Sequence, residues 1–122
     1  MTSYLIESQD SLSLIKERKN LIKKNSFQDA PISIYDVEET PLENALEDLD
    51  TYSFLSDKKV IIIKGLENLK YDDWKKDIDH LFKYIDNPNE DNLLIIEATK
   101  LNNTTKIAKE LKKKCEYISV EL

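Results

Sequence analysis

Two short aliphatic runs restrict the fold of this chain more than any other feature. The runs are Val-Ile-Ile-Ile at 60–63 and Leu-Leu-Ile-Ile at 93–96, and no polar residue interrupts either one. Continuous runs of this kind are typical of strands buried on both faces, as in parallel sheets with helices above and below. The pattern therefore predicts the centre of an α/β fold.

The rest of the chain supplies the outer strands and the helices that such a sheet needs. Shorter apolar or alternating segments predict strands at 4–6, at 31–37 near a sheet edge, and at 117–120. Helices are expected at 8–25, from Pro41 onward, after Gly65 as far as Asn87-Pro88, and at 103–114. The second would start with Thr40 as N-cap, Pro41 as the first helical residue and Glu43 completing a capping box. The expected inward-facing residues are Leu12, Ile15 and Ile22; Leu42, Ala45, Leu46 and Leu49; Trp74, Ile78, Leu81, Phe82 and Ile85; and Ile107, Ala108 and Leu111.

Five strands alternating with four helices predict a three-layer α/β/α domain with a five-stranded, mostly parallel sheet. A length of 122 residues fits one such domain over 1–122. The net charge of −6 argues against strong direct binding of nucleic acid, which depends on neutralising phosphates. Cys115 is the one cysteine, and no apolar run is long enough to span a bilayer. We therefore expect a cytoplasmic protein with no membrane contact.

The motifs of nucleotide enzymes are missing. The turn after the first strand reads Glu7-Ser8-Gln9-Asp10-Ser11, without the glycines whose amides cradle phosphate. Gly65 is the one glycine of the chain, and it follows Lys64 where an ATPase would place a magnesium-binding carboxylate. We expect no ATP hydrolysis, no enzyme activity and no cofactor.

Other reactive or charged residues have simpler interpretations. His80 is expected to be a partly exposed helix residue, and Cys115 a packing residue at a helix end. One cysteine and one histidine cannot build a zinc site. The basic runs at 16–19, 23–24 and 112–114 are expected to be solvated helix faces, although contact with an acidic partner or nucleic acid is the alternative.

Three carboxylates define an alternative function. Glu7, Asp36 and Glu97 each fall near the carboxyl end of a predicted strand, so they would converge on Mg²⁺ in a metal-binding enzyme or receiver-like domain. The competing interpretation is that they are solvated or helix-capping acids.

Phe54 and Leu55 form an apolar pair in an unexpected place. If the helix starting near Leu42 reaches them, both side chains point more than a right angle away from its buried stripe. An exposed pair of this kind would anchor the domain in a pocket on another protein. If the helix instead ends near Asp50, the pair tucks under the loop, and the pattern does not decide between the two.

The segment around this pair resembles the delta subunit of the bacterial DNA polymerase III clamp loader. The matching residues are Thr51-Tyr52-Ser53-Phe54-Leu55-Ser56-Asp57-Lys58-Lys59, which run into the strand at 60–63. Tyr4-Leu5-Ile6, Asn87-Pro88-Asn89 and the strand at 93–96 extend the resemblance over the whole chain. Two departures are Ser8-Gln9-Asp10, where the family usually has Gly-Glu-Asp, and the order Phe then Leu in the pair.

The resemblance implies a P-loop-NTPase-like, AAA+-like fold that has lost its nucleotide site. It also implies that Phe54 and Leu55 bind the sliding clamp (the beta subunit), and that the domain helps to open the clamp during DNA replication. The parent complex would be part of a DNA-directed DNA polymerase holoenzyme. Other clamp-loader subunits would bind through C-terminal domains absent from this chain, which we expect to be the monomeric first domain of a longer delta subunit.

Overall fold

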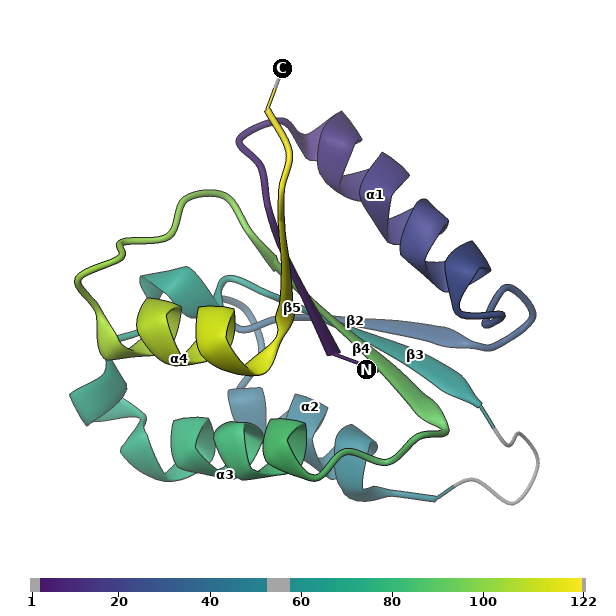
Figure 1. Cartoon of the computed structure of the whole chain (residues 1–122). Helices are drawn as coiled ribbons and strands as arrows, with labels where there is room; N and C mark the ends of the chain where they lie inside the picture. Colours follow the sequence, from purple (N-terminus) through teal and green to yellow (C-terminus); the bar gives the residue numbers. More distant parts are fainter. Residues whose placement is uncertain (1–2, 53–57, 122) are drawn as a thin grey trace.

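The computed structural model describes residues 3–52 and 58–121, which form a five-stranded sheet with helices on both faces (Figure 1). The sheet has the strand order β2-β3-β4-β1-β5, and all four pairings are parallel. The strands are β1 (Ser3–Glu7), β2 (Ile32–Asp36), β3 (Lys59–Lys64), β4 (Asn92–Ala98) and β5 (Glu116–Ser119). The predicted strands are confirmed, including the edge position of β2.

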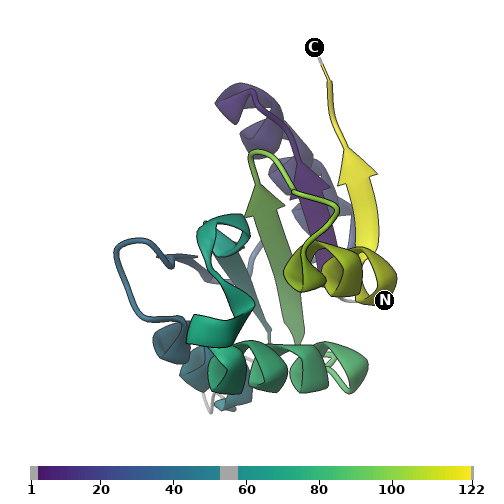
Figure 2. The same cartoon turned by 90° about the vertical axis from the view of Figure 1, so that its left-hand side faces the viewer.

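Within this described part, one helix covers one face of the sheet and three helices cover the other (Figures 1 and 2). The first is α1 (Ser11–Lys24), and the three are α2 (Leu42–Asp50), α3 (Lys75–Asp86) and α4 (Lys106–Lys114). Two 3-10 turns, η1 (Leu66–Asn68) and η2 (Tyr71–Asp73), connect β3 to α3. The α/β/α layers are as predicted. In these residues no helix is long and apolar enough to cross a membrane.

The two aliphatic runs form the middle of the sheet, and their alternate side chains enter two separate cores. Every residue of β3 between its ends, and every residue of β4, is buried. One core, against α1, contains Val60, Ile62, Leu93 and Ile95. The other, against α2, α3 and α4, contains Ile61, Ile63, Leu94 and Ile96. Burial on both faces explains why neither run shows alternation with polar residues.

The predicted inward face of α1 is confirmed for Ile22 but wrong for Leu12 and Ile15. Leu12 and Ile15 are 73% and 39% exposed, whereas the buried residues of the helix are Leu14, Leu21 and Ile22. Arg18 lies one turn from Leu14 and continues this stripe, because its guanidinium pairs with a buried carboxylate of β4. Because the buried stripe contains the charged Arg18, the sequence pattern favoured the face that carries the exposed Leu12 and Ile15.

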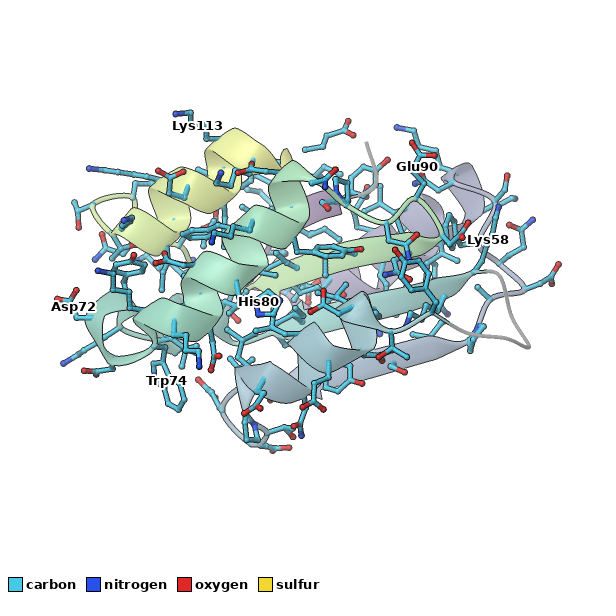
Figure 3. The ribbon with its side chains drawn as sticks, turned by 90° about the horizontal axis from the view of Figure 1, so that it is seen from below. Lys58, Asp72, Trp74, His80, Glu90 and Lys113 are labelled. Atoms are coloured by element: carbon cyan, nitrogen blue, oxygen red, sulfur yellow. The ribbon has the colours of Figure 1, made fainter. Side chains whose placement is uncertain are left out.

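Two helix starts also differ from the prediction. Thr40 does not cap α2: its backbone N–H donates to Asp36 O (2.8 Å), and Pro41 is the N-cap residue, with no side-chain capping bond. Trp74 lies just before α3 and is 42% exposed, because the two 3-10 turns delay the helix until Lys75. Figure 3 shows the indole of Trp74 pointing away from the domain.

Gly65 is required by the turn that leaves β3. Its φ is +88°, and an added Cβ would lie 3.1 Å from Asp36 Oδ1 and 3.3 Å from Glu38 Cγ. We expect Gly65→Ala to lower the free energy of unfolding by about 1–3 kcal/mol, because it adds both backbone strain and a close contact. Urea denaturation followed by circular dichroism would measure the loss. Gly65→Asn should cost less than Gly65→Ala, since asparagine tolerates positive φ better; equal stability of Gly65→Ala and wild type would contradict the prediction.

Candidate protein-binding site

The C-terminal end of α2 leads into the segment that carries the predicted anchor. Phe54 and Leu55 themselves lie outside the described residues. The helix ends at Asp50, with Thr51 as C-cap residue in an extended conformation. The helical-face argument for the pair is therefore wrong, because the helix does not reach position 54. Tyr52, which follows the helix, is 75% exposed.

Lys59, the first residue of β3, binds the end of α2. Its ammonium donates to the Asp48 carboxylate (2.9 Å), to the backbone oxygen of Thr51 (2.6 Å) and to the backbone oxygen of Asp48. The last turn of α2 has no basic residue of its own. Lys59 therefore supplies the positive charge that favours a helix C-terminus. It also ties together Thr51 and β3, which flank the segment 53–57 on either side.

A second side chain satisfies the next carbonyl of the same turn. Asn92 is 1% exposed, and its amide donates to Leu49 O (2.9 Å) and to the Tyr84 hydroxyl (3.0 Å). Asn92 is paired with Lys59 in the β3–β4 register, so the two side chains project from neighbouring strands toward the same helix end. Burial raises the pKa of the Tyr84 hydroxyl. The tyrosine thus stays neutral and able to accept this bond.

The carboxylate that holds Lys59 is itself fixed by a tyrosine. The Tyr35 hydroxyl donates to Asp48 Oδ2 (2.6 Å), while the other oxygen of that carboxylate accepts from Lys59. Burial, together with the bond to Asp48, raises the pKa of Tyr35 to about 12. Residues from β2, β3 and β4 therefore converge on one helix end, which gives the flanks of 53–57 a defined position.

The surface around this helix end is exposed and mixed in charge. His80 on α3 pairs with Asp50 across 2.8 Å, and both side chains are about half exposed, which confirms the exposed-helix interpretation of His80 (Figure 3). Lys58 is exposed and its ammonium lies 4.8 Å from the centroid of the Phe27 ring on the α1 side. With Tyr52, these groups would form the polar and aromatic rim of a protein contact.

The turn after β1 is built for helix capping. Asp10 is the N-cap residue of α1 and accepts from the N–H (3.1 Å) and hydroxyl (2.7 Å) of Ser13, bonds that hold the pKa of Asp10 below its usual range. A pocket of about 460 Å³ lies beside this turn, and its lining includes Glu7, Asp10 and Glu121 but only one cation, Lys112. Carboxylates at this position repel phosphate groups, so the geometry agrees with the missing glycine motif.

The three carboxylates of the alternative interpretation do not converge. Glu97 is 2% exposed and forms a two-point ion pair with Arg18, at 2.6 Å from Nε and 2.9 Å from Nη2. Since Ile6 pairs with Glu97 in the sheet, the next residue, Glu7, points to the opposite face. Asp36 lies on β2, two strands away from β4. In the described residues no group of three His, Cys, Asp or Glu side chains could hold a metal ion.

Glu7 instead fastens the loop after β4. Its carboxylate accepts from the Leu101 N–H (2.8 Å) and from the Tyr117 hydroxyl. Desolvation alone would raise the pKa of Glu7, but these two bonds and the nearby Lys112 and Lys100 hold it below the usual value. Glu7 and Glu97 are therefore not the solvated or helix-capping acids of the competing interpretation either, since Glu7 holds a loop and Glu97 is buried in an ion pair.

The remaining predicted residues divide into solvated and structural ones. Lys16, Lys19, Lys23 and Lys24 are exposed, as predicted, but Arg18 is not a solvated residue. Lys114 pairs with Asp86 (2.7 Å). Cys115 is buried, as predicted, and burial raises the pKa of its thiol to about 12, so the thiolate is scarce at neutral pH.

Comparison with solved structures finds the same fold in other proteins. The Bacillus subtilis DNA clamp loader delta protein superimposes with a TM-score of 0.74 at 23% identity, covering 99% of this chain and 38% of that one. A DNA polymerase III gamma subunit-related protein from Thermotoga maritima gives a TM-score of 0.61 at 13% identity, covering 98% and 41%. The shared fold is an α/β domain around a parallel five-stranded sheet, and in this chain the turn after β1 contains no glycine.

Sequence comparison identifies the particular family. The model of the family described as DNA polymerase III, delta subunit matches residues 4–121, and the chain belongs to this family. DNA polymerase III subunit delta of Bacillus subtilis (strain 168) is 29% identical over 117 residues, which is 91% of this chain. The chain spans 32% of that relative's length.

Proposed function

We propose that this chain is a non-catalytic domain of a clamp-loader delta subunit, and that it binds the sliding clamp and helps to open it during DNA replication. Family membership over 4–121 carries this proposal, together with the segment from Thr51 to Lys59 in which the Phe-Leu pair lies. Phe54 and Leu55 are the proposed anchors in a pocket of the clamp. Other clamp-loader subunits would bind through the parts of a longer delta subunit that lie outside this domain.

The geometry of the flanking residues supports this assignment. Lys59 and Asn92 fix the end of α2, which leads into 53–57, and Thr51, Tyr52 and Lys58 are exposed on either side. Large apolar side chains presented from fixed flanks lose less conformational freedom on binding, which favours affinity. The metal-binding alternative lacks comparable support, because Glu97 is paired with Arg18 and Glu7 points to the other face.

The test is a calorimetric titration of the domain into the sliding clamp of the same organism. We expect Phe54→Ala/Leu55→Ala to weaken binding at least tenfold, about 1.4 kcal/mol. Leu12→Ala/Ile15→Ala is the matched control, since it removes two exposed aliphatic side chains from α1 and should leave the affinity unchanged. Circular dichroism would confirm that each variant is folded.

Two outcomes would count against the proposal in different ways. If the wild type binds and the Phe54/Leu55 variant binds equally well, the partner is right and the anchor is wrong. If the wild type does not bind at high micromolar concentrations, this domain does not bind the clamp by itself.

A further inference from the structure

The outer edge of β2 carries backbone groups that no described strand pairs with. β2 is the first strand in the order β2-β3-β4-β1-β5, so one of its edges faces outward. Pro31 O accepts from Val60 N (2.9 Å) and Val37 N donates to Lys64 O (2.9 Å), which places the backbone groups of odd-numbered residues toward β3. The N–H and C=O groups of Ile32 and Ile34 therefore point to the outer edge.

The side chains of the same two residues are unusually exposed for isoleucine. Ile32 and Ile34 are 51% and 52% exposed. Their register partners, Val60 and Ile62, belong to the core beneath α1, so both isoleucines lie on the α1 face of the sheet. Within the described part of the chain α1 is the helix on this face, and it leaves β2 half uncovered (Figure 1).

A basic groove runs between this strand and α1. It has a volume of about 460 Å³ and is lined by Lys19, Ile22, Lys23, Gln28 and Ile32. Its lining contains two cations and no carboxylate, on a protein whose net charge is −6. The groove is thus complementary to an acidic ligand with apolar side chains.

The middle of this edge lacks the usual protection. Natural edge strands commonly carry charged residues, prolines within the strand or bulges that block pairing with another chain. β2 follows Pro31 and ends at the charged Asp36, but from Ile32 to Tyr35 it has no charged residue and no proline, and its register with β3 is continuous. An open edge of this kind, next to an apolar, basic groove, suits a strand as its occupant, because a helix would leave the outward N–H and C=O groups unpaired.

We propose that the outer edge of β2 and the groove beside Lys19 and Lys23 form a strand-addition site for an extended segment of another protein that presents apolar and acidic side chains on the same face, at every second residue. The segment would pair with the backbone of Ile32 and Ile34. Its apolar side chains would cover these isoleucines and Ile22, and its carboxylates would contact Lys19 and Lys23. This surface belongs to the α1 face and is distinct from the end of α2.

The probe is a synthetic peptide of about eight residues in which every second residue is serine and the positions between are alternately valine and glutamate, so that valine and glutamate share one face of the strand. It is titrated into the ¹⁵N-labelled 122-residue chain. Binding should shift the amide signals of Ile32 and Ile34 and slow their hydrogen exchange at least about tenfold, since new hydrogen bonds protect them. The same peptide with lysine in place of glutamate is the matched control and should bind at least tenfold more weakly. Lys19→Glu/Lys23→Glu should reverse this preference.

Ile34→Pro tests the backbone pairing itself. Proline removes the outward N–H of residue 34 without touching the β2–β3 bonds, so it is tolerated at this edge but should abolish peptide binding. Ile34→Val keeps the N–H and should bind within about threefold of wild type. Unchanged binding by Ile34→Pro would overturn strand addition, and equal binding of the two peptides would overturn the charge preference. Absence of binding would overturn the proposal, and so would pairing of two β2 edges in a dimer of this chain. Should Ile34→Pro fail to fold, the peptide preference of Lys19→Glu/Lys23→Glu decides whether the proposal holds.

Discussion

Arg18→Met is expected to lower the free energy of unfolding by about 3–5 kcal/mol, because it leaves the Glu97 carboxylate buried without a partner. Glu97 is 2% exposed, and both of its oxygens accept from the Arg18 guanidinium. The hydrogen bond that Arg18 donates to Glu97 and, less strongly, the charge of Glu97 raise the pKa of Arg18 despite partial burial, as expected for a pair that favours the charged guanidinium. Methionine retains most of the aliphatic volume, so the loss reports mainly on the unpaired charge.

Chemical denaturation of three variants would separate this effect from packing. Arg18→Met/Glu97→Met removes both charges and should recover most of the lost stability, because an apolar pair can replace a buried ion pair at little cost. Lys16→Met is the matched control on the same helix and should change stability by less than about 0.5 kcal/mol, since Lys16 is exposed. A loss for Arg18→Met no larger than that of Lys16→Met would contradict the structural role given to the pair.

The sheet was predictable because its determinants are local. The runs at 60–63 and 93–96 identify central strands by composition alone, and alternation in 31–37 identifies an edge strand, with no knowledge of the partners. The inward faces of α2 and α4 followed from their 3.6-residue periodicity for the same reason. In these elements apolar side chains signalled burial, and sequence reasoning was sufficient, whereas it was wrong for the exposed Leu12, Ile15 and Trp74.

Where a buried residue is charged, the same reasoning failed. Arg18 occurs in the run Lys16-Glu17-Arg18-Lys19 and looks solvated, yet it lies on the stripe of Leu14 and Leu21. Its partner, Glu97, is 79 positions away. Two signals were available: an arginine four residues after Leu14, and a glutamate directly after an aliphatic run. Neither is decisive without the fold, because only the packing of α1 on β4 brings the two together.

The residues of the candidate site were likewise predictable only in part. Phe54 and Leu55 were singled out by an apolar pair and a family motif, and their role stays a prediction. The bonds that fix their flanks were missed: the sequence marks Lys59 only as part of the family motif, and no pattern singles out Asn92. Lys59 and Asn92 both bind the end of α2 because the β3–β4 register pairs the two residues and because α2 ends at Asp50. Both features are tertiary and leave no periodic trace in the sequence.

Lys59→Met is the corresponding test of the site, with an expected loss of stability of about 1.5–3 kcal/mol, the range for hydrogen bonds that involve a charged group. The side chains of Lys59 and Asp48 are 15% and 23% exposed, so solvent screens this pair only in part. The substitution removes the cation at the end of α2 and the link from Thr51 to β3. If the proposed clamp contact is right, affinity should also fall about fivefold, or roughly 1 kcal/mol, because the flanks of 53–57 are no longer held together before binding.

Lys58→Met separates these effects from a simple loss of positive charge. Lys58 is adjacent in sequence and equally cationic, but it is exposed and lies over the Phe27 ring on the opposite side of the sheet. Its substitution should leave stability within about 0.5 kcal/mol of wild type. If Lys58→Met and Lys59→Met weaken clamp binding equally while only Lys59→Met loses stability, the clamp responds to charge and the fixed end of α2 has no part in binding. A stability loss confined to Lys59→Met, accompanied by the larger affinity loss, would instead tie the packing of this helix end to the function of the segment that follows it.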